Sequence, residues 1–307
     1  MPAAALACLL FNAFVWGVSW WPFRQLNALG LHSVWATGFA FLFSTIVLSV
    51  WRPHAWAGLV RRPRMIWLVL AAGATNIAFN WGVMIGEVVR VVLLFYLMPV
   101  WSLLLARWLL DEPITRAAVA RIVLALSGAA VVLWQPGAGI PLPASLADWL
   151  GLVGGVCFAF VNVLVRRNRD APDDVRALAM FVGGFAVACA MAWAMSESGV
   201  IAFPPMPHWL WISGTIALAL ALLAGNFALQ YGVARVPAAV TAIVMLSEVL
   251  FAALSSIALG GEALNARTVA GGALILAATV LVARTQRESR QGARVHADTL
   301  PDVPRDG

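Results

Sequence analysis

Two pairs of amide side chains, each spaced four residues apart, are the best candidates in this sequence for binding a small polar molecule. Asn76 and Asn80 stand in the phrase NIAFNWGV, and Asn226 and Gln230 stand in the phrase NFALQYGV. Residues four apart lie on one face of an α-helix. An amide both donates and accepts hydrogen bonds, which suits the carboxylate and ammonium groups of an amino acid or the hydroxyls of a sugar. Such side chains also hold helices together in membranes, and the sequence allows both interpretations.

The residues around these amides are strongly apolar, which indicates membrane-spanning helices. Of the 307 residues, 62% are hydrophobic and 11% are charged, and the mean hydropathy is +0.88. A soluble domain needs a more charged surface, and irregular backbone cannot face lipid. Runs of about 20 apolar residues cross the hydrocarbon layer as helices. The sequence predicts ten of them, at residues 4–22, 33–51, 65–85, 91–110, 117–134, 147–165, 176–195, 208–229, 236–257 and 268–284.

The two amide phrases belong to an internal duplication with an offset of 150 residues. Asn76 and Gly82 recur as Asn226 and Gly232, and Glu112 recurs as Glu262. Each half carries five predicted spans, which is an odd number, so the second copy must enter the membrane in the opposite orientation. The predicted fold is therefore all-α and integral to the membrane, with ten transmembrane helices in two inverted five-helix repeats. The predicted units are residues 1–140, residues 141–285 and a disordered cytoplasmic tail, 286–307.

The basic residues predict the orientation of the chain. All twenty are arginines, and with a cytoplasmic N-terminus only Arg24, Arg90 and Arg267 fall on the outer side. This bias follows the positive-inside rule and predicts that both termini are cytoplasmic. Arg90 is read either as an ordinary interfacial charge or as an anion contact at the outer mouth. The sequence has no basic patch on a predicted folded surface, so we expect no nucleic-acid partner.

No motif for enzymatic chemistry is present in the sequence. The three cysteines fall inside predicted spans without a CxxC spacing, and the histidines form no metal-ligand pattern. We also find no phosphate-binding loop and no nucleophile elbow. The sequence therefore predicts a protein that is not an enzyme and that needs no cofactor or metal.

Three motifs resemble the EamA branch of the drug/metabolite transporter superfamily: FVWGVSW (14–20), FYLMPVWSLLLARWLLDE (95–112) and LSEVLFAALSSIALGGE (246–262). The resemblance covers about residues 4–284. It implies a ten-helix carrier that moves small polar metabolites through a central cavity, with both termini cytoplasmic. Members with aromatic-lined cavities include amino-acid exporters. The family often has a Glu-Pro pair in the ninth helix, where this chain has Glu248 followed by Val249, and the sixth helix has Phe160 where a tryptophan is expected.

Further polar and aromatic residues within the spans join the predicted site. Trp16 and Trp20 are predicted to share a face of the first helix, and Pro99 is predicted to kink the fourth helix beside Trp101. Glu248 is read either as a proton-coupling carboxylate or as a structural hydrogen-bonding group. The predicted substrate-binding residues are Asn12, Trp16, Trp20, Asn76, Asn80, Trp101, Asn162, Asn226 and Gln230.

These features predict a secondary-active transporter in the bacterial cytoplasmic (inner) membrane. We expect it to export small metabolites such as amino acids, by alternating access around a cavity between the repeats. An exporter of drugs or quaternary cations is the alternative, and a lipid flippase is a further one. The expected partners are the small-molecule substrate, the lipid bilayer and possible coupling protons, and the chain is expected to act as a monomer or homodimer.

Overall fold

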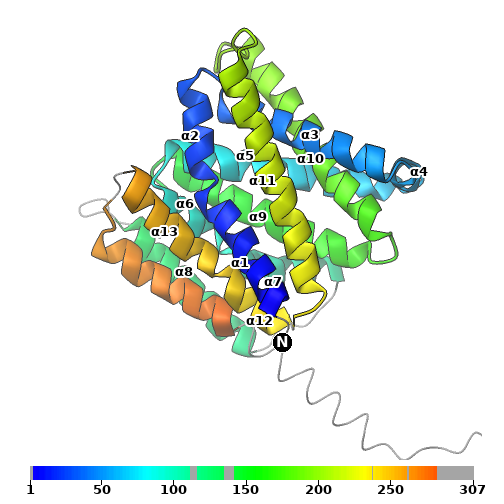
Figure 1. Ribbon diagram of the computed structural model, residues 1–307. Coiled ribbons are helices and arrows are strands. Elements are labelled where there is room, and N and C mark those ends of the chain that lie inside the picture. The colour runs from blue at the N-terminus through cyan, green and yellow to red at the C-terminus, as the bar shows by residue number, and fades with distance from the viewer. Residues whose placement is uncertain (1–2, 111–115, 135–141, 237, 261–262, 282–307) are drawn as a thin grey trace, which may run out of the picture.

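The computed structural model describes residues 3–110, 116–134, 142–236, 238–260 and 263–281, and within these ranges every regular element is a helix (Figure 1). Eight helices are long and apolar enough to cross a membrane, and the shorter apolar helices Ala118–Leu133 and Ala266–Leu281 complete the predicted ten. The all-helical membrane fold is thus confirmed. The predicted tail, residues 286–307, lies outside the described residues, as do Glu112 and Glu262.

The helices follow the predicted spans closely. Those of the first half are α1 (Ala3–Val18), α2 (Trp20–Ala28), α3 (Ser33–Trp51), α4 (His54–Val60), the short 3₁₀ helix η1 (Pro63–Met65), α5 (Ile66–Ile85), α6 (Val88–Phe95), α7 (Met98–Leu110) and α8 (Arg116–Leu133). Those of the second half are α9 (Leu146–Arg167), α10 (Asp173–Glu197), α11 (Trp209–Val233), α12 (Ala238–Met245), α13 (Ser247–Gly260) and the helix Ala266–Leu281.

Three spans are broken into two helices each, which the apolar pattern did not predict. The first span breaks at Ser19, the fourth at Tyr96 and Leu97, and the ninth at Leu246. The breaks at Tyr96 and Leu246 are 150 residues apart, which is the offset of the repeat. Pro99 was predicted to kink a continuous helix. It stands instead in the first turn of α7, where the missing N–H has no helical partner to lose, and the break lies just before it.

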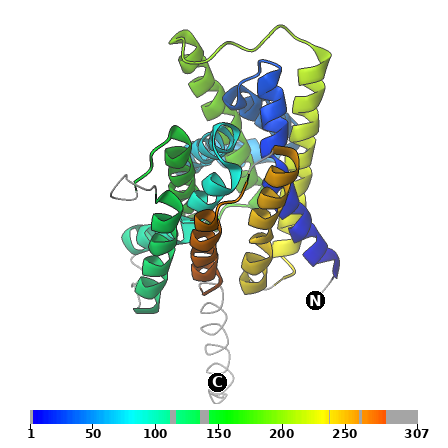
Figure 2. The same ribbon diagram turned by 90° about the vertical axis from the view of Figure 1, so that its left-hand side faces the viewer.

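Helices of the two halves pack on each other through the whole bundle. α5 packs against α9 and α10, and α1 packs against α11 and α13. Gly155 lets α9 approach α6 closely, because a Cβ there would lie 2.7 Å from the carbonyl oxygen of Phe95. A Cβ added at Gly128 of α8 would likewise lie 2.6 Å from the carbonyl oxygen of Gly271, and Figure 2 shows these two helices side by side. Gly151, four residues before Gly155, lies against Val91 and Leu94 of α6, so this pair of small residues allows the close helix contact.

Candidate functional site

The breaks in the fourth and ninth spans meet in the core of the bundle. The Tyr96 hydroxyl lies 3.0 Å from Oε2 of Glu248 and 3.0 Å from the carbonyl oxygen of Met245. Met245 ends α12 and Glu248 stands in the first turn of α13. The Tyr96 side chain, from the break in the fourth span, therefore bridges the break in the ninth span. Tyr96 and Glu248 are both buried. With one proton to donate, the hydroxyl serves one of these acceptors at a time.

Asn12 of α1 extends this polar joint. Its amide nitrogen lies 3.7 Å from the sulfur of Met245, and its side chain is 1% exposed. The Oδ1 atom of Asn12 has no hydrogen-bond partner among the described residues. The Nε1 atom of Trp101, in α7, is likewise buried without a partner. Buried polar atoms without partners are uncommon in native proteins, so each needs an explanation, and a bound ligand is one.

A chain of aromatic rings runs from α1 across the core. Trp16 meets Phe79 edge to face at 6.0 Å between centroids, and Phe79 meets Phe95 at 4.8 Å. Phe95 also contacts Phe158 of α9 at 5.4 Å. Trp16 packs against three of the buried apolar clusters of the core, so it marks the point where they join.

Trp20 belongs to a buried apolar cluster against which Trp16 also packs, although α1 ends at Val18 and α2 begins at Trp20. The break at Ser19 separates them, and the Ser19 hydroxyl donates to the carbonyl oxygen of Trp16 at 2.8 Å. Trp20 donates its Nε1 hydrogen to Oγ of Ser255 in α13 at 2.9 Å, and the guanidinium of Arg24 lies 4.6 Å from its ring centroid. Its role in the structure is to join α2 to α13.

The first amide pair lies between helices. Asn80 is fully buried and donates from Nδ2 to Oγ1 of Thr37 in α3 at 3.0 Å. The Thr37 hydroxyl in turn donates to the carbonyl oxygen of Ser33 at 2.8 Å. Asn76 donates to the carbonyl oxygen of Ala72 in its own helix at 2.9 Å. The Asn80 bond joins α5 to α3 and fits the interpretation of this residue as a link between helices. The Oδ1 atom of Asn80 is buried without a partner among the described residues, as that of Asn12 is.

The second amide pair has different surroundings. Gln230 is exposed, and its Nε2 donates to Oδ1 of Asn226 at 2.7 Å. Gln230 lines a pocket of about 380 Å³, which we call the inner pocket, whereas Asn76 and Asn80 do not line it. Asn162, on α9, is also exposed. The predicted amides therefore do not all line the inner pocket.

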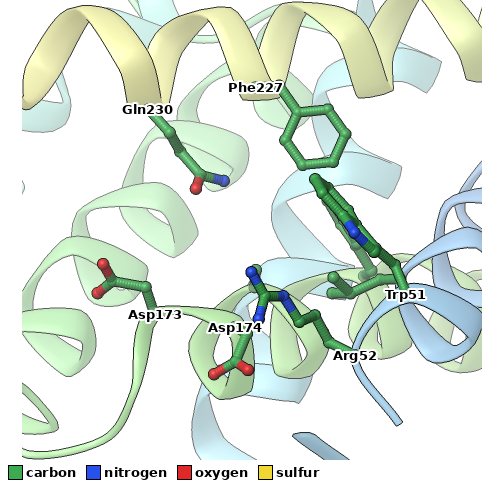
Figure 3. A pocket seen from close by; sticks show the side chains of 9 residues that line it. Trp51, Arg52, Asp173, Asp174, Phe227 and Gln230 are labelled. Atoms are coloured by element: carbon green, nitrogen blue, oxygen red, sulfur yellow. The ribbon is translucent and has the colours of Figure 1, made fainter.

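Three helix ends form the inner pocket (Figure 3). α3 contributes its C-terminal end, α10 its first turns and α11 the turns that carry the second amide pair. One part of the lining is aromatic, with Trp51 edge to face against Phe227 at 5.6 Å. The remaining part is polar. The side chains that Figure 3 labels are Trp51, Arg52, Asp173, Asp174, Phe227 and Gln230.

An ion pair between α6 and α9, with side chains 15% and 2% exposed, joins the two halves at the other end of the bundle. Arg90 of α6 binds Asp148 of α9 through two hydrogen bonds, of 2.6 and 3.0 Å, and it donates to the carbonyl oxygen of Val132 at 2.9 Å. The side chain of Asp148 is 2% exposed. Asp148 also forms a capping box with Ser145 at the start of α9. A hollow of about 360 Å³ lies beside this pair, but Arg90 and Asp148 are already bound to each other.

Sequence reasoning missed several of these residues. Tyr96 is one of two tyrosines in the chain, and it lies inside a quoted motif as part of an apolar run. Asp148 could have been found, because Ser145 and Asp148 show the S-x-x-D spacing of a capping box. Its pairing with Arg90 could not have been read from the sequence. Arg90 was predicted to be either an ordinary interfacial charge or an anion contact at the outer mouth, and in the structure it binds the carboxylate of Asp148.

Comparison with known proteins gives three findings. The model of the EamA-like transporter family matches residues 3–134 and 145–284. A protein of Pseudomonas aeruginosa whose name describes it as an uncharacterized transporter is 25% identical over 213 residues, which make up 64% of this chain and 66% of that protein, just under two thirds of its length. A solved crystal structure covers 92% of this chain and 100% of its own, with a TM-score of 0.57 and 17% identity, and this likeness shows the fold alone.

Proposed function

This chain belongs to the EamA-like transporter family and is a membrane transporter, and from that premise we propose that it is a secondary-active exporter of small metabolites such as amino acids. In this proposal it lies in a bacterial inner membrane with both termini in the cytoplasm, as the arginine distribution favours. The two halves move around a central site by alternating access.

The meeting of the two helix breaks is the observation that carries this proposal. Broken spans at corresponding positions of two inverted repeats are typical of transporter binding sites, because the unwound backbone and nearby polar groups face the substrate there. Here the bridge between Tyr96 and Glu248 joins the breaks. The unpartnered Oδ1 of Asn12 and Nε1 of Trp101 offer one acceptor and one donor in the same core. The rings of Trp16, Phe79 and Phe95 supply an apolar wall.

The conformation supports a state that is accessible from the cytoplasmic side. The inner pocket lies at the arginine-rich helix ends, which we assign to the cytoplasm. At the other ends, Arg90 and Asp148 hold α6 against α9. An exporter takes up its substrate from the cytoplasm, so this is the state in which loading takes place.

Energy for export would come from an ion or substrate gradient. Glu248 has a role in either case, because its bond to Tyr96 couples the two breaks. If protons drive transport, protonation of Glu248 would change its bond with Tyr96 and loosen the joint. If they do not, the carboxylate fixes the geometry of α13.

A cation exporter is the second candidate, and two observations favour it. The rings of Trp16, Phe79 and Phe95 present faces that attract cations. Glu248 supplies a buried carboxylate whose side-chain partner in the described structure is a neutral hydroxyl. A quaternary ammonium compound would use both features.

Flux into proteoliposomes tests the proposal. We would measure uptake of a pool of labelled amino acids, with and without a pH gradient, for the wild type, Asn12→Leu and Asn27→Leu. Asn27 is exposed at the end of α2, so it provides the same substitution outside the core. Saturable uptake that is lost in Asn12→Leu and kept in Asn27→Leu supports the central site.

The other outcomes each contradict a defined part of the proposal. Equal flux in the two variants contradicts the placement of the site at Asn12. No amino-acid flux in the wild type, together with flux of a labelled quaternary ammonium compound, contradicts the amino-acid substrate and favours the cation exporter.

A further inference from the structure

We propose that the inner pocket is a second ligand site, separate from the central joint, and that it binds a neutral zwitterion with a large apolar or aromatic side chain. The role of this site in loading the carrier rests on the proposed function, but the binding itself does not.

The pocket has the size and position of a small-molecule site. Its volume of about 380 Å³ falls within the range of such sites, roughly 300–1,000 Å³. It lies where α3 ends, α10 begins and α11 approaches its C-terminus, so three helices from both halves contribute side chains. A ligand in this position would contact both halves at once, before they move relative to each other.

The aromatic wall selects an apolar group. Trp51 meets Phe227 at 85° between ring planes, and Phe181 and Leu48 add to the apolar lining. Trp51 is 61% exposed. An interfacial tryptophan that anchors a helix in the membrane would be exposed to a similar degree. Its contact with Phe227 of α11 turns it toward the pocket, however, and leaves ring surface for a ligand side chain (Figure 3).

The polar side of the pocket offers both an anion contact and a cation contact. Arg52 makes no ion pair within the described part of the chain, and its guanidinium carbon lies 5.6 Å from the ring centroid of Trp51. Asp173 pairs with Arg176 through Oδ1, so its second oxygen stays available. Asp174 binds Nε2 of His54 at 2.7 Å and accepts from the backbone N–H of Val175.

The charges of the pocket favour a neutral zwitterion over a simple ion. Two carboxylates, Asp173 and Asp174, and one guanidinium group, Arg52, line the pocket. Arg176 and His54 bind the two carboxylates from outside the lining, so Arg52 is the lining charge without an ion-pair partner in the described residues. A cation alone would leave Arg52 unpaired, and an anion alone would gain nothing from Asp173. A zwitterion places its carboxylate on Arg52, where a planar fork can bind it through two hydrogen bonds, and its ammonium group beside Asp173. The amide oxygen of Gln230 can accept a further hydrogen bond from the ammonium group.

Calorimetric titration of the full-length protein in detergent tests this inference with three probes of similar shape. L-Phenylalanine carries both charges, phenethylamine lacks the carboxylate and 3-phenylpropionate lacks the ammonium group. We expect L-phenylalanine to bind about tenfold more tightly than either analogue, since a hydrogen bond to a charged group contributes about 1.5 kcal/mol or more. Arg52→Gln should weaken the binding of L-phenylalanine about tenfold and leave the binding of phenethylamine unchanged. Asp173→Asn should weaken the binding of L-phenylalanine and phenethylamine but not that of 3-phenylpropionate.

Matched variants keep the result interpretable. Arg61→Gln removes an exposed arginine near the end of α4 that does not line the pocket, and it should bind all three probes like the wild type. Arg52→Lys keeps the positive charge but lacks the planar guanidinium group. Its affinity for L-phenylalanine should therefore lie between those of the wild type and Arg52→Gln. Thermal unfolding of each variant shows that the comparison is made between folded proteins.

Two results would overturn the inference: equal affinity for L-phenylalanine in Arg52→Gln and Arg61→Gln, or equal affinity of the wild type for all three probes. Failure of the proposed function gives a different pattern. In that case the probes bind with the expected dependence on Arg52, while no flux of any substrate occurs in proteoliposomes.

Discussion

The two copies of the amide phrase share their sequence pattern and differ in their surroundings. In the first half, Asn80 is fully buried against Thr37, and Asn76 bonds to its own helix. In the second half, Gln230 is exposed beside Asn226 and lines the inner pocket. The two phrases keep the same offset of 150 residues, although Asn80 is replaced by Gln230 and Trp81 by Tyr231.

On the proposed mechanism, this difference is a feature of one conformational state. An inverted repeat places its two copies at opposite ends of the bundle, and a carrier open to one side closes one end and opens the other. The ion pairs follow the same division. Arg90 and Asp148 are bound and buried at one end, whereas Arg52 makes no ion pair in the described structure at the other. On this proposal, the end that holds Arg90 and Asp148 is the closed end, and the end with the inner pocket is the open end.

The largest expected effect comes from breaking the buried ion pair. Asp148→Asn leaves Arg90 without its charged partner, and removing one member of a buried pair costs about 3–5 kcal/mol of stability. At the open end, Asp173→Asn breaks an exposed pair with Arg176, which is worth about 0–1 kcal/mol. Chemical denaturation of both variants in detergent measures the difference.

A double variant shows whether the loss comes from the unpaired charge. Arg90→Met with Asp148→Leu removes both charges, and we expect it to recover most of the stability, because apolar replacements of buried ion pairs are often neutral. Similar losses in Asp148→Asn and Asp173→Asn would contradict the division into a closed and an open end.

The amide pairs themselves give the next largest effect. Asn80→Ala removes a buried hydrogen bond to Thr37 and should cost about 1–3 kcal/mol in the same denaturation assay. Gln230→Ala changes an exposed side chain and should stay within about 0.5 kcal/mol of the wild type. Thr37→Val tests the assignment through a double-mutant cycle, because its effect and that of Asn80→Ala should not add. Additive effects would mean that the amide and the hydroxyl do not act together.

The chain's two tyrosines allow a matched test of the central joint. Tyr96→Phe removes the hydroxyl that bridges the two helix breaks and should cost about 1 kcal/mol. It should also slow uptake into proteoliposomes. Tyr231→Phe removes an exposed hydroxyl and keeps the ring that Arg235 covers at 3.8 Å, so stability and uptake should hardly change. If Tyr96→Phe transports like the wild type, the bridge is not part of the moving joint.

The sequence predicted the spans because lipid imposes a strong and local rule. Ten apolar runs had to be helices, and all ten are. The helix breaks follow no such rule, because Tyr96 and Leu246 lie within apolar runs like their neighbours. Pro99 was the only residue that indicated a break, the one in the fourth span. The spacing of Asn76 and Asn80 correctly placed both on one helix, but it could not show that Thr37, about 40 residues away, would be the partner. The pairings of Arg90 with Asp148 and of Tyr96 with Glu248 depend on how the halves pack, which no local pattern records.

The smallest expected effect compares two histidines that cap helix N-termini. His32 accepts a hydrogen bond from the backbone N–H of Val34 at the start of α3, and burial lowers the pKa of its imidazole below 6.5. His208 accepts the equivalent bond from Leu210 at the start of α11, but it is exposed. A lowered pKa means that the folded protein binds fewer protons than the unfolded chain, so stability is full above pH 6.5 and falls as the pH drops below that value.

His32→Asn keeps an acceptor for the cap and removes the imidazole whose pKa burial lowers, and His208→Asn is the same substitution at an exposed cap. His32→Asn should therefore flatten the loss of stability between pH 7 and about pH 5, measured as the midpoint of denaturation, whereas His208→Asn should leave most of that slope in place. The difference between the two variants matters more than either curve, because other groups titrate in the same range in both. An equal slope in both variants would mean that the burial of His32 does not change the pH dependence of stability. It would contradict this difference between the two halves.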